Sequence, residues 1–295
     1  MKILIAGSTG LIGSNLTSFL ESKGHQVFRL VRKETDKGGI LWDPKNQSID
    51  PQELEGFDAV INLAGENIAG GRWTEAKKKR ILESRVKSTR LLCETIKKLQ
   101  DPPKVLINAS ALGYYGHVPK GTVTESTPAG EGFLSHVCQE WESATEILLG
   151  EEIRIVYLRT GIVLSPEGGA LKTMLLPFKL GLGGVVGSGK QFMSWIDIED
   201  EIRAIYHCLK TESLHGPVNL TAPNPVTNRE FTKTLGKVLS RPTFLPMPAF
   251  LARLAFGEMA DEMLLASAKI IPEKLQKTGY EFKYPELEDS LKHLL

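Results

Sequence analysis

Short apolar runs alternate with longer polar segments over the first 160 residues of the chain. The apolar runs are nearly continuous and predict buried strands at residues 3–6, 27–31, 59–63, 105–109 and 153–158. The polar segments have helical periodicity and predict helices at residues 14–23, 74–99 and 137–149. Buried strands separated by helices are typical of a parallel sheet that is covered on both faces. We therefore expect an α/β fold with a doubly wound parallel sheet.

The pattern changes after residue 160, where glycine-rich loops interrupt the alternation. The elements expected there are a strand and helix over residues 195–209, a helix over 229–239 and an apolar, helically periodic stretch over 247–271. We expect a first domain over residues 1–165 and a smaller lobe over 166–295 that covers the carboxyl edge of the sheet. The segment at about 190–210 is expected to return to the first domain.

A glycine-rich turn directly follows the first predicted strand. Gly7, Gly10 and Gly13 are spaced G-x-x-G-x-x-G between a strand and a helix, the context in which such a pattern indicates a dinucleotide site. The first glycine permits a tight turn, the second lets a pyrophosphate approach the backbone, and the third lets the helix pack on the strand. Free amides at the helix start then face the negative charge, as in a Rossmann domain. The predicted cofactor-binding residues of this turn are Gly7, Thr9, Gly10, Leu11, Ile12 and Gly13.

The end of the second predicted strand favours NADP over NAD. NAD-binding domains usually carry an acid about 20 residues after the turn, where it binds the ribose 2′-hydroxyl. This chain has Val31, Arg32 and Lys33 at that place, and the two cations would pair with a 2′-phosphate that an acid would repel. Glu34 follows directly, so a shift of one or two residues would restore an acid. We expect NADP (as NADP⁺ or NADPH) to be the cofactor, and NAD fits the pattern less well.

Composition and charge exclude several other classes of function. The 295 residues are 41% hydrophobic and carry 36 basic and 35 acidic side chains, a formal net charge of +1. This balance argues against binding to nucleic acid or to a membrane surface through bulk charge. No run of about 18 apolar residues predicts a helix that spans a membrane. Three separated cysteines and six scattered histidines form no metal or disulfide pattern, so we expect no bound metal and a protein of the reducing cytoplasm. The expected partner is a small-molecule substrate.

Strand ends farther along the chain resemble those of the extended short-chain dehydrogenase/reductases, the group that includes sugar-nucleotide epimerases and dehydratases. The segments that carry this resemblance, in the order of the family, are Asn62-Leu63-Ala64-Gly65, residues 108–116, Leu158-Arg159-Thr160-Gly161 and residues 195–200. The segments that are similar to an atypical branch, the epimerase family proteins of subfamily U, are residues 63–68, 72–74, 84–86, 176–184 and 187–189.

This resemblance implies an NADP-dependent oxidoreductase or epimerase-like enzyme. The further cofactor-binding residues that it implies are Leu63, Ala64, Gly65, Arg85, Ala109 and Arg159. Many members of the superfamily form homodimers through helices of the first domain, so a homodimer is one arrangement that the resemblance leaves open.

The chain departs from the family where proton transfer normally occurs. Most members carry Tyr-x-x-x-Lys on the helix after the serine-bearing strand, and that pair exchanges a proton with the substrate while hydride moves. This chain has Leu134 and Cys138 at the tyrosine and lysine places, or Gly132 and His136 in a register shifted by two. Relatives have an asparagine where Arg85 stands on the preceding long helix. The standard proton relay is therefore absent, whereas the phosphate-binding turn is intact.

The candidate catalytic residues follow from these departures. Counting back along the strand end places either Ser110 or Ala111 at the position of the family's serine. Tyr114, Tyr115 and His136 are candidate proton donors, and Tyr114 stands where relatives have a small aliphatic residue. We expect Ser110 and Tyr114 to be the catalytic residues. The missing relay also favours a second hypothesis, a regulatory protein that senses NADP(H) without turnover.

Overall fold

The structure is a computed structural model that describes residues 1–33 and 38–295. Glu34, the acid that a shift of register would bring to the second strand end, lies outside the described residues.

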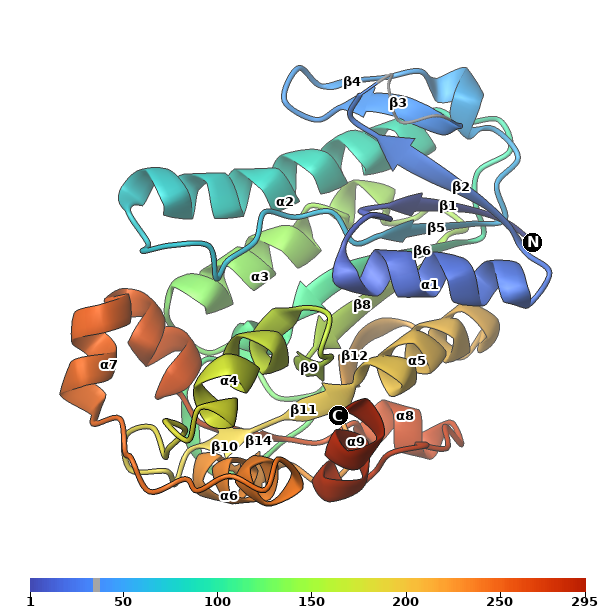
Figure 1. Ribbon diagram of the computed structural model, residues 1–295. Coiled ribbons are helices and arrows are strands. Elements are labelled where there is room, and N and C mark those ends of the chain that lie inside the picture. The colour runs from blue at the N-terminus through green and yellow to red at the C-terminus, as the bar shows by residue number, and fades with distance from the viewer. Residues whose placement is uncertain (34–37) are drawn as a thin grey trace.

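An eight-stranded sheet runs through the centre of the molecule (Figure 1). Its strands in spatial order are β12 (Gly216–Leu220), β8 (Arg154–Thr160), β6 (Val105–Ala111), β5 (Ala59–Asn62), β1 (Lys2–Ala6), β2 (Gln26–Val31), β3 (Gly39–Asp43) and β4 (Ser48–Ile49). Neighbouring strands are parallel except for the antiparallel pair β3 and β4. Strand order reverses on the two sides of β1, so the carboxyl ends of β1 and β5 form the switch point at which open α/β sheets bind ligands.

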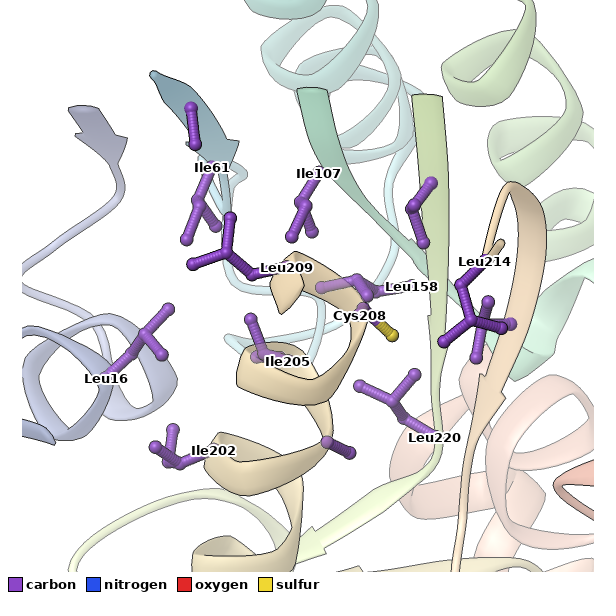
Figure 2. Packing of buried hydrophobic residues seen from close by; sticks show 14 of the residues in the cluster. Leu16, Ile61, Ile107, Leu158, Ile202, Ile205, Cys208, Leu209, Leu214 and Leu220 are labelled. Carbon is purple, nitrogen blue, oxygen red and sulfur yellow. The ribbon is translucent and has the colours of Figure 1, made fainter. Parts of the chain in front are cut away.

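Helices cover both faces of this sheet, as the strand pattern predicts. The helices on the two faces are α1 (Leu11–Ser22) and α5 (Ile198–Lys210) on one, and α2 (Glu75–Ile96) and α3 (Phe133–Ser143) on the other. Along β1, Ile3 and Ile5 join the core under α1 and α5, whereas Leu4 joins the core under α2. Figure 2 shows the first of these cores, where Leu16 of α1 and Ile205 of α5 point toward the sheet. The doubly wound fold is confirmed.

Outside the central sheet, the described residues form three two-stranded sheets and a further hydrophobic core. The strands of these small sheets are β7 (Val118–Val123), β9 (Ile162–Leu164), β10 (Phe192–Met193), β11 (Trp195–Asp197), β13 (Val226–Thr227) and β14 (Ala268–Ile270). The other helices are α4 (Gly169–Lys179), α6 (Asn228–Val238), α7 (Ala249–Phe256), α8 (Glu273–Lys277) and α9 (Leu287–Leu294). Buried Trp195 and Phe231 pack with α4, α6 and α9 in this core. The domain boundary at residue 165 stays a prediction.

Two expected helices differ from the structure. The helix expected at residues 137–149 begins earlier, at Phe133, because the Glu262 carboxylate accepts hydrogen bonds from the amides of Phe133 and Leu134. The periodic stretch 247–271 is divided, because Gly257 adopts a left-handed φ of 61° that ends α7, and the chain then enters β14. No helix within residues 1–33 and 38–295 is both long and apolar enough to cross a membrane.

Candidate functional site

Two glycines of the β1–α1 turn are required by the protein's own packing. Gly7 has a left-handed φ of 80°, and a Cβ atom there would lie 2.7 Å from the Leu63 carbonyl group after β5. A Cβ atom on Gly13 would lie only 2.2 Å from the Gly7 carbonyl oxygen. Larger side chains at either place would therefore push α1 or β5 away from the turn.

Gly10 differs from these two glycines. Its φ of −75° suits any residue, and a Cβ atom there would meet only the Gly7 oxygen, at an ordinary 3.5 Å. The residue is exposed, and α1 begins after it with no side-chain cap and no acid in the first turn. The protein itself does not require a glycine here, so the space in front of it suits a ligand that approaches the backbone. Unpaired amides at a helix start prefer an anion, which fits a dinucleotide pyrophosphate.

The remaining predicted residues of the turn and of the second strand end lie around this space. Thr9 is exposed, and Leu11 and Ile12 begin α1. Val31 is the buried last residue of β2, followed by exposed Arg32 and Lys33. Neither of these two cations forms a hydrogen bond or ion pair with any residue that the structure describes. Both charges are therefore free to pair with an anionic ligand.

Arg85 lies on α2 beside the end of β5. Its Nη1 atom donates to the carbonyl oxygens of Glu66 (3.1 Å) and Ile81 (3.0 Å), and its Cζ atom lies 4.9 Å from the Trp141 ring centroid. A Cβ atom on Gly65 would lie 3.1 Å from that Cζ atom. Burial lowers the pKa of Arg85, and among the described residues no carboxylate pairs with it. The predicted cofactor residues Leu63, Ala64 and Gly65 thus follow β5, next to a half-buried guanidinium that retains free donors.

A buried polar network beneath the strand ends was not predicted from the sequence. The Asn62 amide nitrogen donates to the Thr89 hydroxyl (2.9 Å) and to the Asn108 side-chain oxygen (2.7 Å). The Trp141 indole nitrogen also donates to Thr89, at 3.0 Å. The network ties β5 and β6 to α2 and α3 directly below the carboxyl edge of the sheet. Its sequence signal is one asparagine in each of two buried central strands, because buried amides require partners.

Ser110, the predicted catalytic serine, is tied to a buried ion pair. Its hydroxyl donates to the Glu142 carboxylate at 2.7 Å. The same carboxylate accepts two hydrogen bonds from Arg159, from Nε and Nη2, each 2.9 Å long. Because its only proton goes to Glu142, Ser110 can accept a hydrogen bond from a ligand but has no proton left to donate. Ala109, the other predicted residue of this strand end, is half-buried next to it.

The two tyrosines after β6 differ in their surroundings. Tyr115 is 1% exposed, accepts a hydrogen bond from Arg159 Nη1 (2.9 Å) and donates to Asn219 (2.7 Å). Burial raises the pKa of Tyr115 to about 12. Tyr114 is half-buried, and its ring lies 3.4 Å from the Arg159 guanidinium carbon. Each of the three Arg159 nitrogens donates to a protein oxygen, so Arg159 has a structural role in this cluster, and its predicted contact with the cofactor stays a prediction.

The helix that normally carries the proton relay supplies few groups for proton transfer here. A Cβ atom on Gly113 would lie 2.9 Å from Leu134 Cβ and 3.8 Å from Cys138 Sγ, so both side chains pack on the segment after β6. Burial raises the pKa of the Cys138 thiol to about 11. His136 is exposed on the opposite side of α3. At the two relay positions α3 therefore offers an apolar side chain and a neutral thiol, and the carboxylate that it does bring to Ser110, from Glu142, is paired with Arg159.

Comparisons with known proteins agree with this geometry. The model of the NAD dependent epimerase/dehydratase family matches residues 3–220, and a model described as a domain of unknown function, DUF1731, matches residues 247–294. An epimerase family protein of Mycobacterium bovis is 44% identical over 290 residues, which cover 98% of this chain and 96% of that protein.

Solved structures give the same result. The human epimerase family protein SDR39U1, crystallised with NADPH, is 40% identical, with a TM-score of 0.93 over 100% of this chain and 99% of that chain. A UDP-glucose 4-epimerase of Thermus thermophilus in complex with NAD is 18% identical, with a TM-score of 0.75 over 100% of this chain and 97% of that chain. At that identity the second match supports the fold alone.

Proposed function

Because the chain belongs to the NAD dependent epimerase/dehydratase family, we propose that it binds NADP(H) at the carboxyl edge of the central sheet. The observation that carries the proposal is the contrast within the turn: the protein's packing requires Gly7 and Gly13 but leaves open space in front of Gly10. The uncapped start of α1 would hold the pyrophosphate. The human relative that was crystallised with NADPH adds support from outside the chain.

The free cations at the second strand end support NADP rather than NAD. Arg32 and Lys33 would pair with the 2′-phosphate of the adenosine ribose, because neither is neutralised by a described residue. Arg85 has unpaired donors beside Gly65 and would contact a further anionic group of the cofactor or of the substrate. Arg32 and Lys33 directly follow β2, and Arg85 lies beside the segment that follows β5, so all three cations support a site at this edge of the sheet.

We further propose that the protein is an oxidoreductase or epimerase-like enzyme for a small polar substrate. The cofactor would supply hydride exchange at its nicotinamide ring. Ser110 would accept a hydrogen bond from a substrate hydroxyl, because its own proton is held by Glu142. Tyr114 is the proposed proton donor, since Tyr115 is buried with a pKa of about 12 and His136 is exposed on α3.

A second function is favoured by the contents of α3. Leu134 and Cys138 stand where the family's relay normally lies, and neither an apolar side chain nor a neutral thiol transfers a proton efficiently at neutral pH. The alternative is a regulatory protein that binds NADP(H) without turnover. Saturable NADPH binding with no hydride transfer across a panel of carbonyl compounds and sugar nucleotides would support this alternative against the enzyme.

Calorimetry with NAD⁺, NADH, NADP⁺ and NADPH tests the binding proposal. We expect saturation with the NADP forms, and failure of all four coenzymes to saturate would contradict the proposal. Gly10→Ala is expected to weaken NADPH binding by about tenfold or more because its methyl group enters the ligand space. The same change should cost no more than about 1 kcal/mol of stability, as expected for a helix cap.

Gly13→Ala is the matched control. Its Cβ atom would overlap the Gly7 carbonyl inside the protein, so we expect a loss of about 3 kcal/mol of unfolding free energy together with binding. Urea unfolding of both variants separates the two effects. If Gly10→Ala bound NADPH as tightly as the original protein, the open space would have another purpose.

A further inference from the structure

Large apolar side chains are exposed mainly in one part of the C-terminal lobe. Of 15 exposed large hydrophobic residues among those that the structure describes, nine lie within residues 176–182 and 244–254. These nine, which we call the apolar face, are Leu176, Leu180, Leu182, Phe244, Leu245, Met247, Phe250, Leu251 and Leu254. Six of them keep 58% or more of their surface exposed. Exposed apolar residues that gather in this way mark an interaction site.

The two segments of the apolar face are held next to each other by hydrogen bonds between the chain around them. Arg241 Nε donates to the Lys179 carbonyl oxygen at 2.9 Å, and the Met247 amide donates to the Val185 carbonyl oxygen at 2.8 Å. Gly181 lies beside Pro242 between these two bonds. Figure 1 shows α4 and the loop after it on the same side of the molecule as the chain that leads into α7. The face is therefore one surface built from two distant parts of the sequence.

Basic residues lie within and next to these two segments, although the whole chain is nearly neutral. Residues 172–190 contain three basic residues and residues 241–254 contain two, while neither range contains an acid. Lys172, Lys179 and Arg241 are exposed and form no ion pair with any described residue. Only Arg253 is paired, with Asp261. Unpaired cations therefore accompany the apolar face.

This combination of side chains selects an anionic occupant. A second copy of the chain that docked through the same face would bring like charges together, which is unfavourable. The apolar side chains also protrude into solvent, whereas a site for a partner helix would place them along a groove. A lipid bilayer meets both conditions, because its headgroups attract the cations and its acyl boundary accepts leucine and phenylalanine without a fixed shape.

We infer that the apolar face docks the protein peripherally on a bilayer that contains anionic lipids. The near-zero net charge of the chain does not oppose this inference, because the attraction acts locally, within about one Debye length of the basic segments. Docking through this face is a property of the C-terminal lobe and requires neither coenzyme nor substrate. Its test is therefore independent of the proposed function.

Co-sedimentation of the full chain with lipid vesicles tests the inference. We expect a partition coefficient about tenfold or more higher on vesicles of phosphatidylcholine with phosphatidylglycerol than on phosphatidylcholine alone, and weaker binding at high salt. Lys179→Glu should lower the partition coefficient on anionic vesicles by about fivefold or more, because the attraction between this cation and the lipid headgroups is lost. Phe250→Ser combined with Leu254→Ser should reduce binding to both kinds of vesicle.

Leu149→Ser is the matched control, since Leu149 is 71% exposed but lies outside the apolar face. Its binding should equal that of the original protein. Equal binding to neutral and anionic vesicles, or an equal loss in Leu149→Ser, would overturn the inference. Two further results would overturn the inference if the protein binds neither kind of vesicle. One is a dimer that Phe250→Ser abolishes, and the other is capture of an acidic amphipathic peptide. Either result would assign the apolar face to another protein chain.

Discussion

The turn after β1 and the carboxyl end of β6 differ in whether their polar groups have partners within the protein. At the turn, the first amides of α1 and the charges of Arg32 and Lys33 have no partner among the described residues. At the end of β6, the polar atoms of Ser110, Glu142 and Arg159 bind one another. Unpaired groups at an exposed edge are available to a ligand, whereas mutually paired groups stabilise the fold. The proposed cofactor binding and the proposed proton transfer thus depend on separate groups of the chain.

The difference concerns what each of the two functions would need from the chain. The turn needs only backbone geometry, which Gly7 and Gly13 secure through contacts inside the first domain. Proton transfer needs a side chain with a free proton close to the substrate. At the end of β6 the Ser110 proton is already donated to Glu142. Changes at Ser110, Glu142 and Arg159 should therefore alter stability first, and changes at the turn should alter NADPH binding first.

Breaking the ion pair tests the stability half of this comparison and has the largest expected effect. Glu142→Gln leaves the Arg159 guanidinium buried without its counter-charge, since Arg159 is 3% exposed. We expect a loss of about 3–5 kcal/mol of unfolding free energy in urea. The folded fraction should still bind NADPH, because no atom of the turn is altered.

Gln139→Glu is a useful charge control for that variant, because it changes the exposed side of the same helix. Its unfolding free energy should change little. Abolished NADPH binding in folded Glu142→Gln would show that the two ends of the site are coupled, contrary to the separation argued here.

A buried acid on α5 predicts a pH dependence that belongs to the fold and not to the turn. Burial raises the pKa of Glu201 to about 8, although its carboxylate accepts a hydrogen bond from Thr160 at 2.9 Å. The folded protein therefore keeps this proton at pH values where the unfolded chain has lost it, so stability falls as pH rises toward 8. Between pH 6 and 9 the loss of unfolding free energy caused by Glu201 amounts to roughly 2–3 kcal/mol.

Urea unfolding of the Glu201→Gln variant measures this effect. The amide cannot ionise, so the decline in stability between pH 6 and 9 should become shallower by about that amount. NADPH affinity at pH 7 should remain the same as in the original protein. An unchanged pH profile would mean that other groups control the alkaline loss of stability.

The sequence could predict the sheet and the turn because both depend on local patterns. Apolar runs locate β1, β2 and β5 closely, and the glycines need only neighbours within the first domain. The ion pair of Glu142 and Arg159 and the hydrogen bonds around it could not be predicted in this way, because the partners are far apart in the sequence. Ser110 and Glu142 are separated by 32 residues, and Tyr115 and Asn219 by 104. A contact of the same kind, from Glu262, sets the start of α3.

The smallest expected effect belongs to the choice of coenzyme at the second strand end. Arg32→Glu replaces an exposed cation with an acid. The acid would repel the 2′-phosphate of NADPH and would accept a hydrogen bond from the 2′-hydroxyl of NADH. We expect NADPH affinity to fall by about tenfold, while NADH affinity stays the same or rises.

Calorimetry of both coenzymes measures this preference, and Arg90→Glu serves as the control because it makes the same change of charge on an exposed part of α2. Equal losses of affinity for NADPH and NADH would mean that Arg32 attracts both coenzymes through its charge and does not contact the 2′-phosphate specifically. A selective loss for NADPH with unchanged urea stability would place the binding specificity at the open edge of the sheet. If Glu142→Gln is also unstable but still binds NADPH, the two results together would show that coenzyme binding at this edge does not depend on the ion pair of Glu142 and Arg159.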